Sequence, residues 1–184
     1  MDIKISSQQI LRVLLVLCWI IFIGVCIDAG GFLVSSIYWS FVKPNADGFF
    51  WNKLPMLSLY QYDKGHFMAI CLLICIVAVI KASIFYRIIV LLQENKLNMA
   101  KPFTREVGSF LFLTAWLTIM VGFFCSYAGK YVGQLTSKGI PMPGMKEMGL
   151  AGSDVWFFMG ATLLVIGFIF KRGIELQAEN DLTI

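Results

Sequence analysis

Four ionisable side chains of this sequence lie within or next to long apolar segments: Asp28, His66, Lys130 and Asp154. An ionisable group in hydrocarbon costs free energy, so such a residue is a candidate for function. Two carboxylates and a histidine together suit a divalent cation, a proton or a small ligand. Whether they can do this chemistry depends on whether the four residues lie at one depth.

Helix geometry places the two aspartates at a similar depth. Asp28 lies about 22 Å along the first apolar segment, and Asp154 lies about 24 Å along the fourth, counted from its opposite end. His66 and Lys130 would lie just beyond that level. Three interpretations remain open. The residues are helix-terminal groups at the lipid headgroups, a buried ion-pair or hydrogen-bond layer with Lys130, or a metal, proton or ligand site.

The elements that must position these residues are membrane helices. The chain has 184 residues, of which 59% are hydrophobic and 14% are charged, and its formal net charge is +4. Soluble globular domains are about 25% charged, so the composition excludes an ordinary soluble domain, and it also excludes a disordered chain. No long basic run is present, which argues against direct nucleic-acid binding.

Four apolar stretches are long enough to cross a hydrocarbon core about 30 Å thick. They predict an all-α fold, a single transmembrane four-helix bundle over residues 1–184. The predicted spans are approximately residues 10–33, 66–88, 107–129 and 153–171, followed by a tail over 172–184. The first stretch is longer than the apolar core of a signal peptide and no small-residue cleavage site follows it, so we expect it to be retained.

Two local patterns concern the middle of the chain. The second helix has no glycine or proline between His66 and Asn95, which predicts a helix about 45 Å long that extends beyond the membrane. Within it, Lys81 is expected to extend its ammonium toward the inner interface. Thr104 is the predicted N-cap of the third helix, with Glu106 in the first turn.

Small residues inside the spans predict packing rather than chemistry. The five cysteines are expected to act as small apolar side chains, without a disulfide or metal. Gly122 and Ser126 form a small-xxx-small pair, and Gly160 and Gly167 lie in the fourth span, which favours close helix contact. The loops over roughly 43–65 and 130–151 are rich in proline, aromatic and methionine residues. They form either an aromatic belt at the headgroups or a lid over an outward-facing pocket.

The distribution of basic residues predicts the orientation. The segments that hold the two termini and the second connection carry nine basic residues: Lys4, Arg12, Lys81, Arg87, Lys96, Lys101, Arg105, Lys171 and Arg172. The other two loops carry six: Lys43, Lys53, Lys64, Lys130, Lys138 and Lys146. Because cytoplasmic loops carry the excess of Lys and Arg, both termini are expected in the cytoplasm.

Two segments resemble the bacterial membrane family called domain of unknown function 2975. One contains Pro102-Phe103-Thr104 before the third span; the other is the C-terminal sequence R-G-I-E-L-Q-A-E-N-D-L-T from Arg172 to Thr183. Members have four spans, a P-F-T before the third helix, and a similar C-terminus. The sequence departs from the family before Pro102, where a basic stretch and a glycine are usual. The resemblance implies a bacterial cytoplasmic (inner) membrane protein without an established biochemical activity.

The resemblance also implies a partner, because genes of this family often lie beside small helix-turn-helix regulators. A cytoplasmic partner surface would include the following residues: Arg105, Glu175, Glu179, Asn180 and Asp181. The alternative interpretation is that the tail is a solvated helix end packed on the second and third helices. No nucleophile elbow, P-loop, zinc-protease, haem or dinucleotide motif is present, so neither an enzyme nor a cofactor is expected.

Two functions are therefore considered. The first is a non-enzymatic membrane protein with a regulatory or protein-interaction role. The second is a carrier or sensor of a small lipophilic or cationic ligand near Asp28 and Asp154, in the outer half of the bundle. The expected partners are the lipid bilayer and the helix-turn-helix protein. An oligomer of this chain is also compatible with the sequence.

Overall fold

The computed structural model describes residues 7–42, 50–93 and 103–181, and over those residues its regular secondary structure is helical, without a strand. Its elements are α1 (Ser7–Phe41), the short 3-10 helix η1 (Trp51–Lys53), α2 (Leu57–Tyr62), α3 (Lys64–Gln93), α4 (Arg105–Ser137) and α5 (Ser153–Asp181). The four long helices are apolar and long enough to cross a membrane. The expected all-α fold of a multi-pass membrane protein is therefore confirmed, and the helices are compatible with a four-helix bundle.

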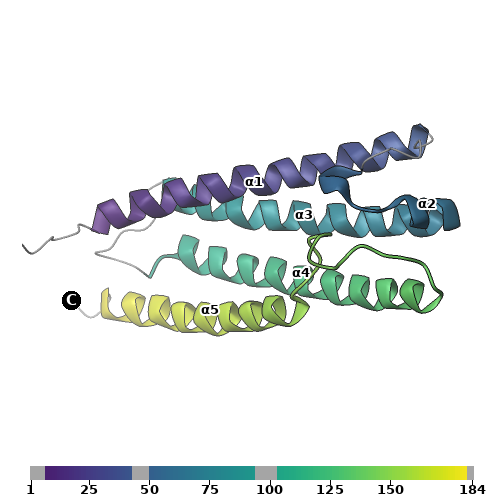
Figure 1. Cartoon of the computed structure of the whole chain (residues 1–184). Helices are drawn as coiled ribbons and strands as arrows, with labels where there is room; N and C mark the ends of the chain where they lie inside the picture. The colour runs from purple at the N-terminus through teal and green to yellow at the C-terminus, as the bar shows by residue number, and fades with distance from the viewer. Residues whose placement is uncertain (1–6, 43–49, 94–102, 182–184) are drawn as a thin grey trace, which may run out of the picture.

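The four long helices alternate in direction and form two hairpins, α1 with α3 and α4 with α5 (Figure 1). The hairpins meet along α3 and α4. Among the described residues, no backbone contact within 8 Å joins α1 to α4, α1 to α5, or α3 to α5. The helices thus form an open row in which α3 and α4 are central: in an 18-residue apolar stretch of each helix, 39% of the residues are buried in α3 and in α4, against 6% in α1 and 11% in α5.

We call the end where α1 begins and α5 ends the terminal end, and the opposite end, next to α2, the loop end (Figure 1). Helix α3 is continuous through Gln93, as its lack of glycine and proline predicts; Asn95 is outside the described residues. The Thr104 hydroxyl accepts a hydrogen bond from the Val107 amide, 3.3 Å away, which confirms the predicted N-cap of α4.

Close packing between α4 and α5 depends on the glycines that the sequence singled out. A Cβ on Gly160 would lie 2.5 Å from Cγ1 of Ile119, and one on Gly122 would lie 3.0 Å from the ring of Phe157. Because α5 packs on Gly122 within its first turns, whereas α4 continues to Ser137, α4 extends about 22 Å beyond that contact. Helix α5 therefore begins partway along α4, and the connecting chain returns beside α3 and α4 to reach it (Figure 1).

The described parts of both loops at the loop end fold into the core instead of lying on it. Phe50 and Leu59 from the first loop and Met148 and Leu150 from the second are each at most 1% exposed. Trp39 of α1 stacks on Phe67 of α3 and contacts two aromatic rings of the first loop and α2, Phe50 and Tyr60. Neither loop is a simple aromatic belt, because much of its apolar surface is buried against protein.

Candidate functional sites

Asp28 anchors the first loop to α1. Its Oδ1 accepts hydrogen bonds from Nε1 of Trp51, at 3.1 Å, and from Nδ2 of Asn52, at 3.4 Å. The approach needs a glycine, because a Cβ on Gly31 would lie 2.1 Å from Cδ2 of Trp51. It also needs the left-handed backbone of Asn52 and Lys53, whose φ angles are 54° and 57°. The carboxylate, which is exposed, thereby accepts hydrogen bonds from two side chains of the loop and holds the loop against α1.

Lys81 anchors the second loop in a corresponding way. Its Nζ donates a hydrogen bond to the carbonyl oxygen of Gly149, at 2.6 Å, and lies 5.3 Å from the ring centroid of Trp156 in α5. The expectation that Lys81 extends toward the terminal end is wrong. Side chains of a helix tilt toward its N-terminus, and the N-terminus of α3 is at the loop end. The ammonium therefore meets the loop that returns from α4.

Asp28 and Lys81 line one cavity of about 160 Å³, together with Val25, Phe32, Ile74, Ala78, Met148 and Gly149. No N–O distance of 4.0 Å or less joins the two charges; in the described part of the chain the side-chain ion pair is Arg172 with Glu175. The cavity could hold a few water molecules or a small polar ligand. The Asp28 carboxylate thus lines the same cavity as the Lys81 ammonium, which was expected to extend toward the inner interface.

The structure does not assemble the layer of Asp28, His66, Lys130 and Asp154. His66 lies at the loop end, where its Nδ1 is 2.5 Å from the hydroxyl of Tyr131 and its ring stacks on Tyr62. Lys130 is exposed on α4, and Asp154 is exposed in the first turn of α5. Only Asp28 lines the intramembrane cavity. The expected common depth is wrong: Asp28 lies beside Lys81, which is about 22 Å along α3 from His66.

The cysteines and potential metal ligands do not form a site in the described residues. All five cysteines are free, and four of them are buried: Cys18, Cys71, Cys75 and Cys125. No group of three or more His, Cys, Asp or Glu side chains there could hold a metal ion.

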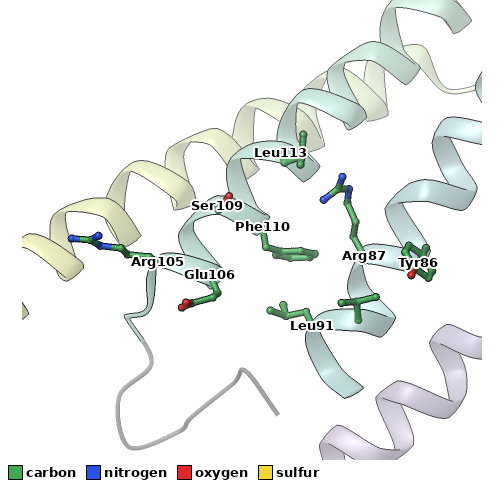
Figure 2. A pocket seen from close by; sticks show the side chains of 9 residues that line it. Tyr86, Arg87, Leu91, Arg105, Glu106, Ser109, Phe110 and Leu113 are labelled. Atoms are coloured by element: carbon green, nitrogen blue, oxygen red, sulfur yellow. The ribbon is translucent and has the colours of Figure 1, made fainter. Parts of the chain in front are cut away.

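A second, larger cavity of about 550 Å³ lies between α3 and α4 toward the terminal end (Figure 2). Its polar lining consists of Tyr86, Arg87, Arg105, Glu106 and Ser109. Its apolar lining consists of Val90, Leu91, Phe110 and Leu113. In Figure 2 the Phe110 ring extends from α4 toward α3, whereas the Arg105 side chain points away from the cavity toward α5. The cavity combines cationic and apolar surfaces.

On the other side of the α4 N-terminus, a groove of about 330 Å³ lies between α4 and α5. It is lined by Arg105, Gly108, Ser109, Phe112, Lys171, Ile174 and Glu175. Two residues of the expected partner surface, Arg105 and Glu175, are therefore brought together. Glu179 and Asn180 are exposed on the last turns of α5, and the side chain of Asp181 lies outside the described residues.

The tail after Arg172 continues α5 without a break and packs on α4. A Cβ on Gly173 would lie 2.5 Å from the Phe103 ring, and one on Gly108 would lie 3.3 Å from Cδ1 of Ile174. The tail was expected to pack on the second and third membrane helices; it packs on the third, α4, but no backbone contact within 8 Å joins α5 to the second, α3, among the described residues. The same packing preforms the groove beside Glu175.

Sequence reasoning missed two features of these sites. The role of Lys81 could have been found from the direction of its helix, and the close approach of Trp51 had a signal in the pair Gly30-Gly31.

Comparison of the chain with protein-family models, with curated proteins and with solved structures found no match.

Proposed function

We propose that this chain is a non-enzymatic protein of the bacterial inner membrane that binds a cytoplasmic regulatory protein through the terminal ends of α4 and α5. The observation that carries the proposal is the preformed α4–α5 groove with Arg105, Lys171 and Glu175 on its walls. A surface already held in place by packing costs less conformational entropy on binding than a flexible tail would.

The charge distribution supports both the side of the membrane and the kind of partner. The segments at the terminal end carry all four arginines of the chain, which is typical of a cytoplasmic side. Exposed groups of both signs border the groove, so a protein partner with complementary charges could be selected there. The resemblance of the C-terminal sequence suggests a helix-turn-helix regulator as that partner.

The experiment is a crosslinking pull-down of the tagged full chain from native membranes. We expect capture of a soluble helix-turn-helix protein, and loss of most of that capture when Glu175 and Glu179 are both replaced by lysine or when residues 177–184 are deleted. Glu147→Lys makes the same type of charge change at the loop end and should leave capture intact. Equal capture by the deletion variant, with normal membrane insertion, would reject the proposal.

The cavity beside Asp28 and Lys81 favours a second candidate function, the binding of a small ligand by a carrier or sensor. Its two charges are opposite, so it suits a neutral polar or zwitterionic molecule better than a bare cation. We expect Asp28→Asn to abolish the thermal stabilisation that glycine or a related zwitterion gives the purified protein. Asp154→Asn is the control, since Asp154 does not line the cavity. The absence of any such stabilisation in the unmodified chain would remove this candidate.

A further inference from the structure

Arg87 of α3 is a cation without a protein partner among the described residues. It is half-buried, and the structure gives its guanidinium neither a hydrogen bond nor an ion pair there. Centring the 30 residues of α3 on a hydrocarbon core about 30 Å thick leaves about five residues outside at each end. Arg87 then lies at the boundary between hydrocarbon and headgroups, where an unpaired charge needs a counter-ion or water.

The surroundings of Arg87 are those of an amphiphile site. Its side chain extends into the cavity between α3 and α4, toward the level of Leu113 (Figure 2). Arg87 is the cation that extends into the cavity, because the Arg105 side chain turns toward α5, and Ser109 adds a hydroxyl donor to the wall. The guanidinium lies among apolar side chains, with Leu113 near its level and Leu91 and Phe110 between it and the terminal end (Figure 2). The cavity thus places a cation in an apolar crevice, which suits an anionic group joined to hydrocarbon.

We propose that this cavity binds an anionic phospholipid, with Arg87 contacting the phosphate and the α3–α4 crevice holding the first carbons of an acyl chain. A guanidinium can bind two phosphate oxygens at once, which a lysine cannot do. Basic pockets between membrane helices are established sites for anionic headgroups. The lipid cavity and the α4–α5 groove share Arg105 and Ser109, but Arg87 lines only the cavity, so a change at Arg87 tests this inference apart from the partner surface.

The test measures lipid binding to the purified full chain by native mass spectrometry and by thermal stability. We expect phosphatidylglycerol to bind and to raise the melting temperature more than phosphatidylcholine does. Arg87→Gln should weaken phosphatidylglycerol binding by about tenfold, the effect of losing one charge-assisted contact. Arg172→Gln is the matched control. It removes an arginine at the same end of the molecule, but one that already pairs with Glu175 at 3.0 Å, so binding should be nearly unchanged.

Three outcomes would overturn the proposal. Equal losses in the Arg87 and Arg172 variants would mean that phosphatidylglycerol responds only to overall charge. Stabilisation by millimolar inorganic phosphate, matching that by the lipid, would assign the cavity to a soluble anion. Equal binding of phosphatidylcholine and phosphatidylglycerol would exclude charge recognition. Should Arg87→Gln fail to fold, Arg87→Lys provides the test, since it keeps the charge but should still weaken phosphatidylglycerol binding.

Discussion

At the scale of single residues, two charged side chains have a common role, the exposed Asp28 of α1 and the partly buried Lys81 of α3. Asp28 accepts hydrogen bonds from the first loop, and Lys81 donates one to the second. Non-helical backbone at membrane depth is tolerated only where protein groups or water satisfy it. Each of the two charged side chains satisfies polar groups of a loop and attaches that loop to its helix.

Replacing Lys81 by methionine tests this role. The side chain keeps a similar length but loses both the hydrogen bond to Gly149 and the cation–π contact with Trp156. We expect a loss of about 1–3 kcal/mol of stability, measured as a lower melting temperature in detergent. Lys130→Met removes an exposed helical lysine and should change the melting temperature little. A smaller effect at Lys81 than at Lys130 would show that the anchor contributes nothing.

At the scale of elements, the loops decide how the helices are covered. Helix α1 has few buried residues in its span, yet Trp51 packs over it at Gly31. The aromatic cluster around Trp39 and Phe67 then closes the loop end. The loop sequences are compatible with an aromatic belt at the headgroups and with a lid over an outward-facing pocket. The burial of Phe50 shows that part of the first loop instead belongs to the core.

Substitutions at two neighbouring glycines distinguish the effect of this packing from the effect of helix propensity. A Cβ on Gly31 would overlap the Trp51 ring, whereas one on Gly30 would meet nothing within 4 Å. We expect Gly31→Ala to displace η1, which should speed tryptic cleavage after the exposed Lys53 and lower thermal stability. Gly30→Ala should stabilise slightly or have no effect, because alanine favours the helix. Similar cleavage rates for the two variants would contradict the close approach of Trp51.

At the scale of the whole molecule, the two hairpins form a row with distinct ends (Figure 1). Because the ammonium of Lys81 points toward the loop end, it no longer contributes to the basic residues of the terminal end. Eight of the original nine remain there, against six in the other two loops, and all four arginines are among the eight. The prediction of cytoplasmic termini therefore survives the reassignment of Lys81.

Reporter fusions test that orientation. A C-terminal green fluorescent protein should fluoresce, and alkaline phosphatase inserted after Lys138 should be active, because the enzyme folds only outside the cytoplasm. An insertion of phosphatase after Ile184 is the matched control and should be inactive. The reverse pattern would place the proposed partner surface on the wrong side of the membrane and would exclude a cytoplasmic regulator.

The amino-acid sequence by itself determined the class of the molecule, because four uncharged or nearly uncharged stretches of membrane length can be satisfied only as helices in lipid. It also determined local features that depend on nearby residues, such as the N-cap at Thr104 and the small residues between α4 and α5. These follow from helix geometry and from contacts close in sequence.

Only the tertiary structure decided which polar groups meet. Residue counting gave Asp28, His66, Lys130 and Asp154 comparable depths, but α1 continues to Phe41 and Asp28 lies beside Lys81, about 22 Å along α3 from His66. Asp28 instead shares a cavity with Lys81, and Arg87 with Arg105. Counting residues gives depth only when the ends of a helix are known, and these ends, like facing and lateral order, depend on how whole helices and loops pack, which is information distributed over the entire chain.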